Sequence, residues 1–184
     1  MIRNSLRSAA TVLACACLAL SPASARQWNP DARGAALDYT QIVHAKGPGE
    51  VVVVWWVTPQ AFPPGVNDQV VQDVLSRYVV LGIAHGRTAT TGQMSFDAIA
   101  DLRITDSTDR SLGSLPSNVT PPEVAQTISA LQTLARQSLG PIGQGIRWFV
   151  FDGSTIHACS SGMMSVPFDR ETYTYDTPIP GCPK

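Results

Sequence analysis

The sequence has little charge and almost no lysine. Asp, Glu, Lys and Arg make up 15% of its 184 residues, the formal net charge is −1, and Lys46 and Lys184 are the only lysines. A protein that binds nucleic acid needs a positive surface to neutralise phosphates, and this composition does not supply one. We therefore expect no nucleic-acid partner.

Recognisable catalytic and cofactor motifs are also missing. The chain contains no Gly-x-Ser-x-Gly nucleophile elbow, no Cys-x-x-Cys pair and no glycine-rich phosphate loop followed by lysine. Serine and aspartate are so common that many Ser-His-Asp sets can be assembled on paper, which gives no single set any weight. The sequence therefore identifies no catalytic residue, and no cofactor is expected.

No hydrophobic run is long enough to cross a membrane. Residues 9–20 form an uncharged apolar stretch of about 12 residues, whereas a hydrocarbon core of about 30 Å needs about 20. Arg3 and Arg7 precede this stretch, and residues 21–25 follow it with a small-residue ending, Ala-Ser-Ala. This order is typical of a secretory signal, so we predict that residues 1–25 are a cleaved signal peptide.

Cleavage leaves residues 26–184 as a single exported globular domain, periplasmic or secreted, with no transmembrane span in the mature chain. Loss of Arg3 and Arg7 leaves 11 basic against 14 acidic residues, so the mature net charge is −3. A lipoprotein signal that ends at Cys15 or Cys17 is the alternative, but the residues before these cysteines fit such a signal poorly.

The mature chain keeps two of the four cysteines, Cys159 and Cys182. An even pair in an exported protein is typical of a disulfide. The bridge would close a loop of 24 residues, which contributes about 3 kcal/mol in the chain-entropy model. The spacing excludes a Cys-x-x-Cys metal or redox motif.

Alternating apolar residues predict six or seven strands, and apolar residues three to four positions apart predict two helices. The expected strands are 37–44, 50–58, 78–88, 96–105, 147–151, 155–159 and 171–176, and the expected helices begin near Asp68 and cover 121–139. We predict a mainly β, antiparallel, sandwich-like domain with a crossover helix. The alternative is an α+β domain in which two helices cover an antiparallel sheet.

Three local patterns make this prediction specific. Residues 51–57 are β-branched or aromatic on both alternating faces, which predicts a central strand covered on both sides. Thr120 and Glu123 match a capping box at the start of the second helix. Asp152-Gly153 is a hairpin-turn dipeptide between two expected strands.

A short polar segment, Asp106-Ser107-Thr108-Asp109, carries two carboxylates. Calcium loops alternate their oxygen ligands around a glycine, and this segment lacks that order. An Asx-type turn is the favoured interpretation.

The three histidines, His44, His85 and His157, all fall on expected strands. Imidazoles from three strands could hold copper or zinc, but their spacing carries no metal signature. His85 shares a strand face with apolar residues, which favours a buried, hydrogen-bonded histidine, and His157 lies near the predicted disulfide. We expect no metal and keep the shared histidine site as a weaker alternative.

Four aromatic residues are the candidate ligand contacts. Trp55 and Trp56 must point to opposite faces of one strand, and Tyr173 and Tyr175 share one face of another. Most of these side chains should belong to the core. An exposed one would offer a platform for a peptide, a glycan or a partner protein.

The strong patterns are structural, so the leading hypothesis is a non-enzymatic exported domain that binds a protein or another component of the cell envelope. A secreted hydrolase with a site built from loops is the second hypothesis, and it requires a histidine beside a carboxylate in a pocket. A periplasmic copper or zinc protein that uses the histidines is the third. An enzyme is therefore the less favoured class.

Overall fold

The computed structural model describes residues 25–28, 40–43, 49–61, 68–179 and 181–183. Its strands are β1 (Ala25–Trp28), β2 (Thr40–Val43), β3 (Glu50–Val57), β4 (Tyr78–Thr88), β5 (Met94–Phe96), β6 (Arg103–Thr105), β7 (Ser111–Gly113), β8 (Arg147–Asp152), β9 (Gly162–Phe168) and β10 (Glu171–Thr177). Its helices are α2 (Gln69–Arg77), α3 (Pro122–Leu139) and α4 (Pro141–Gly145), with 3-10 turns η1 (Pro59–Ala61) and η2 (Ser117–Val119). None of these helices is long and apolar enough to cross a membrane.

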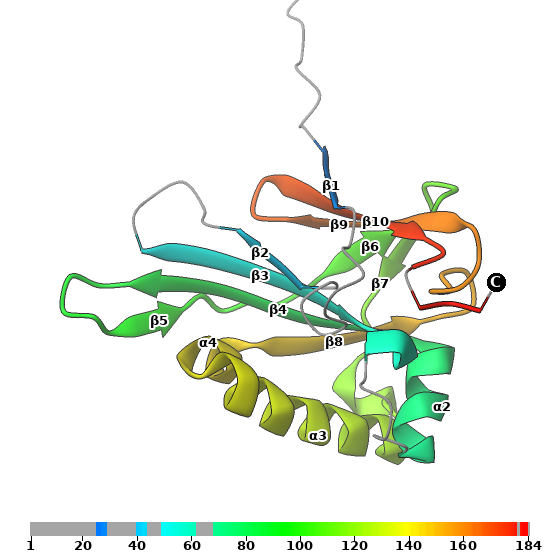
Figure 1. Cartoon of the computed structure of the whole chain (residues 1–184), viewed down its shortest axis with the longest axis horizontal. Helices are drawn as coiled ribbons and strands as arrows, with labels where there is room; N and C mark the ends of the chain where they lie inside the picture. The colour runs from blue at the N-terminus through cyan, green and yellow to red at the C-terminus, as the bar shows by residue number, and fades with distance from the viewer. Residues whose placement is uncertain (1–24, 29–39, 44–48, 62–67, 180, 184) are drawn as a thin grey trace, which may run out of the picture.

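The strands form two five-stranded sheets (Figure 1). The β3 sheet has the order β2-β3-β4-β5, with β8 also paired to β4, and the β9 sheet has the order β1-β10-β9-β6-β7. All pairings are antiparallel except that of β1 with β10. The predicted mainly β, antiparallel, sandwich-like class is confirmed. The described residues contain ten strands rather than six or seven, because segments of three or four residues complete the sheets and the seven-residue β9 was not predicted.

Both faces of the β3 sheet are covered. Toward the β9 sheet, the ring of Trp56 meets that of Tyr175 edge-on with centroids 5.5 Å apart. On the other face, Trp55 packs against Trp148 of β8, whose Nε1 donates to Gln132 of α3 at 2.8 Å. Figure 1 shows α3 and α4 on the side of the β3 sheet away from β9 and β10. Strand β3 is therefore buried on both faces, as its apolar run predicts.

Helix α2 begins as the sequence predicts. The carboxylate of Asp68 accepts from the backbone N–H groups of Val70 at 3.0 Å and Val71 at 3.4 Å, which lack partners within the helix. The buried face of the helix consists of Val71, Val74 and Leu75. The helix leads directly into β4, so its C-terminal end is held at the edge of the core.

Helix α3 covers the predicted range, but the predicted capping box is wrong. Pro121 is the N-cap residue, and no side chain caps the helix. Thr120 Oγ1 instead donates to the Pro116 carbonyl oxygen at 3.1 Å, so the hydroxyl serves the preceding 3-10 turn. Gly140 ends the helix with a φ of 55°, which glycine adopts readily, and Pro141 begins the short helix α4.

The predicted hairpin at Asp152-Gly153 is wrong, and the strand expected after it, 155–159, does not form. The backbone N–H of Gly153 donates to the Arg77 carbonyl oxygen at 3.1 Å, so the chain leaves β8 beside the end of α2 instead of turning back. This contact replaces the turn that the dipeptide predicts.

A hairpin does form between β9 and β10. Its turn residues, Asp169 and Arg170, have φ values of 48° and 64°. Positive φ at both central residues is type I′ geometry, which Asn and Gly usually supply. An Asp-Arg pair is not typical of such a turn, so the hairpin and its strand β9 were not predicted.

The single strand predicted at 96–105 is also wrong. Strand β5 ends at Phe96 in the β3 sheet, residues 97–102 are irregular, and β6 begins at Arg103 in the β9 sheet. The alternating pattern therefore belongs to a crossover between the sheets, in which Leu102 and other apolar residues point into the shared core.

The segment after β6 forms the predicted Asx-type turn. Asp106 Oδ1 accepts from the Thr108 hydroxyl at 2.7 Å, the Thr108 N–H at 2.9 Å and the Arg110 N–H at 3.1 Å. These hydrogen bonds, that of the Thr108 hydroxyl first, lower the pKa of Asp106 to about 2.

Candidate functional site

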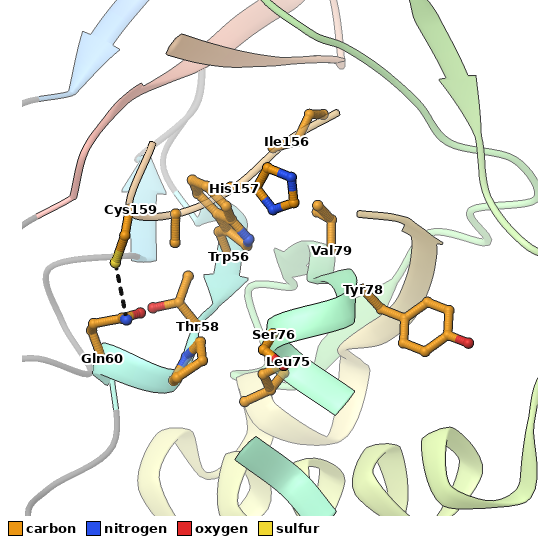
Figure 2. Close-up of a pocket in the computed structure, with 12 residues that line it drawn as sticks. Trp56, Thr58, Gln60, Leu75, Ser76, Tyr78, Val79, Ile156, His157 and Cys159 are labelled. Atoms are coloured by element: carbon orange, nitrogen blue, oxygen red, sulfur yellow. Dashed lines mark hydrogen bonds between the residues drawn. The ribbon is translucent and has the colours of Figure 1, made fainter. Parts of the chain in front are cut away.

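A pocket lies where β3 ends, between α2 and the segment that follows β8 (Figure 2). We call it the Trp56 pocket, and its volume is about 190 Å³. Its apolar walls include Trp56, Leu75, Val79 and Ile156. The end of a buried strand and the start of a helix thus enclose a small, largely apolar space.

Two polar atoms of the Trp56 pocket, Thr58 Oγ1 and Gln60 Oε1, are buried and have no hydrogen-bond partner among the described residues. Thr58 follows β3 directly and is 1% exposed, and Gln60 lies in η1. Figure 2 shows the two side chains directed toward each other at one side of the pocket. Buried polar atoms are nearly always hydrogen-bonded, so these two atoms indicate a place for a bound group or water.

The predicted disulfide borders this pocket and is confirmed. Cys159 and Cys182 are bonded, with their Cα atoms 5.3 Å apart. Gln60 Nε2 donates to Cys159 Sγ at 3.2 Å, as the dashed line in Figure 2 shows. The backbone N–H of Ile179 also donates to the Ala158 carbonyl oxygen at 2.8 Å. The C-terminal segment is therefore held against the pocket wall by a covalent and a hydrogen-bonded link.

The other polar side chains among the residues that line the pocket are Ser76, Tyr78 and His157. His157 is exposed, and Ser76 Oγ donates to the Asp73 carbonyl oxygen within α2 at 2.9 Å. Among the described residues that line the pocket, none is aspartate or glutamate. The lining offers hydrogen-bonding groups in an apolar setting, rather than a nucleophile with a base and an orienting acid.

A second group of polar side chains lies at the opposite end of β3. We call it the His85 cluster, and it consists of Glu50, His85, Arg87, Asp97 and Asp169. His85 Nε2 lies 2.6 Å from Glu50 Oε1, and His85 Nδ1 lies 3.0 Å from Asp97 Oδ2. Arg87 Nη2 lies 2.9 Å from the same Asp97 oxygen. Asp169 comes from the β9–β10 turn, so the cluster joins the two sheets.

The contacts within the His85 cluster favour the charged form of Glu50. The hydrogen bond with His85, followed by the charges of His85 and Arg87, lowers the pKa of the Glu50 carboxyl, and desolvation only partly opposes this shift. His85 is 6% exposed, and both of its ring nitrogens contact a carboxylate. The structure thus shows the buried, hydrogen-bonded histidine that its strand face predicts.

A hollow of about 360 Å³ opens beside the His85 cluster. Its wall includes His85, Asp97, Asp169 and Phe168, whose ring meets the imidazole edge-on at a centroid distance of 6.3 Å. This arrangement provides the histidine beside a carboxylate that the hydrolase hypothesis requires. Both nitrogens already contact carboxylates, however, so neither is free to take a proton from a nucleophile.

The structure does not bring the histidines together within its described part. His44 lies outside the described residues, His157 lies at the Trp56 pocket, and His85 lies at the other end of β3. The potential ligands that do come together are Glu50, His85 and Asp169, whose ligand atoms all lie within 4.8 Å of one another.

The four aromatic candidates are all in the core. Trp55 is 4% exposed, Trp56 and Tyr175 are 2% exposed, and Tyr173 is 1% exposed. The platform hypothesis required an open face, and these positions have none: Trp55 packs against Trp148 on the helix-covered face of the β3 sheet, and Trp56 meets Tyr175 between the two sheets. Burial raises the pKa of Tyr175 well above its ordinary value, while its hydroxyl donates to a β3 carbonyl oxygen. Only Trp56 borders a candidate site, as an apolar wall.

Sequence reasoning missed the residues that define both sites. Thr58 and Gln60 stand beside Pro59, where the pattern indicated only the end of a strand. Glu50 only begins an expected strand, and no expected element includes Asp169. No local pattern marks these residues, because contacts with distant parts of the chain bring them into the two candidate sites.

No protein-family model, no curated protein and no solved structure matches this chain. The function must therefore be argued from the two sites themselves.

Proposed function

We propose that this chain is an exported, non-enzymatic binding domain of an oxidising compartment, periplasmic or extracellular, whose Trp56 pocket accepts an apolar group that carries a hydrogen-bond donor. The observation that carries the proposal is the pair of buried, unpartnered atoms, Thr58 Oγ1 and Gln60 Oε1, in a pocket with apolar walls.

Both of these oxygen atoms lack a hydrogen-bond partner among the described residues. A buried polar atom without a partner costs about 1–3 kcal/mol of stability. A ligand with an N–H or O–H group supplies the missing hydrogen bond, whereas an isosteric ligand without a donor leaves the atoms unpaired and binds more weakly. The expected occupant is a side chain of a partner protein, or an envelope molecule of the same chemistry.

Two further features support this proposal. The pocket histidine, His157, has no acidic residue beside it in the lining, and the Ser76 hydroxyl is bonded to its own helix, so the polar groups favour binding over catalysis. The disulfide at the pocket wall favours an oxidising compartment, in agreement with the signal peptide predicted at 1–25.

The test compares indole with 1-methylindole, which has the same ring but no N–H donor. Binding to the disulfide-bonded chain is followed through amide chemical shifts in ¹H–¹⁵N spectra. We expect indole to shift the amides of Trp56, Thr58 and Ile156 and to bind about 10-fold more tightly than 1-methylindole, because a single buried hydrogen bond contributes about 1.4 kcal/mol here.

Two threonine variants show whether the pocket is responsible. Thr58→Val removes one unpartnered oxygen and should reduce the preference for indole. Thr127→Val is the matched control, because Thr127 is also 1% exposed but its hydroxyl donates to the Glu123 carbonyl oxygen at 2.9 Å. Equal affinity for both probes, or no binding of either, would overturn the proposal.

Export is tested separately by the mass of the protein isolated from the cells that make it. We expect a chain that begins at residue 26 and is lighter by two hydrogens because of the Cys159–Cys182 bond. A mass that includes Arg3 and Arg7, or two free thiols, would contradict export, whereas the indole test uses the disulfide-bonded chain and is read separately.

A further inference from the structure

The His85 cluster has the chemistry of a metal site as well as that of a structural network. We propose that it binds one divalent transition-metal ion, with Zn²⁺ as the preferred ion, through His85 Nε2 and one carboxylate oxygen each from Glu50 and Asp169. Each of these three residues offers one ligand atom within 4.8 Å of those of the other two, and Nε2 is the nitrogen that faces Glu50 Oε1. One imidazole and two carboxylates form a ligand set suited to zinc, and a fourth position stays open to water.

The imidazole is already oriented for this role. His85 Nδ1 lies 3.0 Å from Asp97 Oδ2, which allows the Nδ1–H group to donate to that carboxylate. A histidine that binds a metal usually donates its other N–H group to a carboxylate or carbonyl, and this contact fixes both the tautomer and the ring plane. Asp97 is therefore a positioning residue that directs Nε2 toward Glu50 and Asp169.

The present contact between His85 and Glu50 can convert into metal ligation by a small movement. Nε2 and Oε1 are 2.6 Å apart, joined by a hydrogen bond. Two ligand atoms of a tetrahedral zinc ion lie about 3.3 Å apart, given bonds of about 2.0–2.1 Å. The pair must therefore separate by less than 1 Å, and the proton between them leaves to solvent as the ion enters.

The charges of the cluster also fit a divalent cation. Glu50, Asp97 and Asp169 bring three negative charges, and Arg87 offsets one of them through contacts at 2.9 Å with Asp97 and 3.7 Å with Glu50. With a neutral imidazole, the remaining charge is −2. A divalent ion neutralises this charge, whereas the proton that now joins His85 and Glu50 neutralises only part of it.

The ligands come from elements that the fold holds in place. Glu50 is the first residue of β3, His85 lies in the middle of β4, and Asp169 lies in the tight β9–β10 turn. The Phe168 ring packs edge-on against the imidazole and limits its rotation. Metal binding would therefore add a bond between the two sheets, and we expect it to raise the unfolding temperature.

The test is calorimetric titration of the full, disulfide-bonded chain with ZnCl₂. We expect one ion per chain and a binding affinity that falls at least about 10-fold in Asp169→Asn and Glu50→Gln. Asn tolerates the positive φ of the turn, so the Asp169 variant keeps the hairpin. An unchanged ¹H–¹⁵N spectrum outside the cluster confirms that each variant is folded.

Two control variants exclude other zinc sites. Asp101→Asn removes an exposed carboxylate that borders the same hollow, and His157→Gln removes the exposed histidine of the Trp56 pocket. Both should leave the zinc affinity unchanged within about 2-fold. In the wild-type chain, Zn²⁺ should shift the ¹⁵N resonance of His85 Nε2 much more than that of Nδ1.

Several results would overturn the metal site. These are the absence of zinc binding by the wild-type chain, equal affinity in wild type and Asp169→Asn, or a loss of affinity in His157→Gln. None of these results bears on the indole test of the Trp56 pocket, so the two proposals fail independently.

Discussion

The polar side chains at the two ends of β3 differ in whether they have hydrogen-bond partners. At the Glu50 end, both nitrogens of His85 contact carboxylates, and Arg87 completes the network. At the other end, Thr58 Oγ1 and Gln60 Oε1 have no partner among the described residues. A satisfied network stabilises one arrangement of the chain, whereas unpartnered atoms lower stability and leave capacity for a ligand.

Two threonines show the same contrast on a smaller scale. Thr58 and Thr127 are both 1% exposed, but Thr127 donates to the Glu123 carbonyl oxygen, whereas Thr58 Oγ1 has no partner among the described residues. Burial alone therefore does not show whether a polar side chain is satisfied. An unpaired buried hydroxyl is retained at a cost to stability, which is why Thr58 belongs to the proposed binding site.

The largest expected effect comes from breaking the satisfied network. In His85→Ala, Glu50 and Asp97 lose their shared partner and Phe168 loses a packing neighbour, so we expect the free energy of unfolding to fall by about 4 kcal/mol. Urea denaturation followed by circular dichroism measures this change. The control is His157→Ala, an exposed histidine whose removal should change stability by less than about 0.5 kcal/mol. Similar losses in both variants would remove the distinction between the two ends of β3.

Opening the disulfide should have the next largest effect. The Cys159→Ser/Cys182→Ser variant frees a loop of 24 residues, and we expect a loss of about 3 kcal/mol in urea denaturation. Because this bond borders the Trp56 pocket, indole binding should weaken in the same variant. Unchanged stability would show that the C-terminal segment is held mainly by other contacts, such as the Ile179 to Ala158 hydrogen bond.

Replacing Thr58 and Thr127 by valine should change the free energy of unfolding in opposite directions. Thr58→Val removes an unpartnered hydroxyl with little change in shape, so we expect it to stabilise the chain by about 1 kcal/mol. Thr127→Val removes a partnered hydroxyl, so we expect it to destabilise the chain by about 1 kcal/mol. Thermal unfolding of both variants measures the difference. A loss of stability in Thr58→Val would mean that its hydroxyl is already satisfied.

The smallest expected change in the free energy of unfolding comes from Asp106, a hydrogen-bonded carboxylate outside both sites. The pKa of Asp106 is about 2, below its ordinary value of 3.8, because of the bonds from Thr108 and Arg110. Its contribution to stability is therefore complete above about pH 4 and disappears as the pH falls toward 2. Asp106→Asn keeps an acceptor oxygen but does not titrate. The difference in unfolding free energy between wild type and this variant should shrink from pH 5 to pH 2, and a constant difference would contradict the assignment.

Much of the fold could be predicted because its signals are local. The apolar run at 51–57 and the start of α2 at Asp68 each involve residues close together in sequence. The errors arose where another contact replaces the expected one. Gly153 bonds to the distant end of α2 instead of forming a hairpin, and Thr120 bonds back to the nearby Pro116 instead of capping α3.

The sites could be predicted only in part. The sequence correctly predicted a buried, hydrogen-bonded His85, because that residue shares a strand face with apolar neighbours. It did not indicate the partners Glu50 and Asp169, since the pairing of β3 with β4 and the position of the β9–β10 turn bring them there. The four aromatic candidates could bind a ligand only if one of them were exposed, and packing on both faces of the β3 sheet buries all of them.

The sequence by itself determined the mainly β class, the positions of the main strands and helices, and the Cys159–Cys182 disulfide. The spacing of apolar residues and the capping residues are signals carried by short stretches of sequence. The disulfide follows by elimination, because the predicted mature chain keeps only these two cysteines. Only the tertiary structure decided which polar atoms are satisfied. Hydrogen bonding at a buried atom depends on what the rest of the chain places within about 3 Å of it, and no short stretch of sequence contains that information.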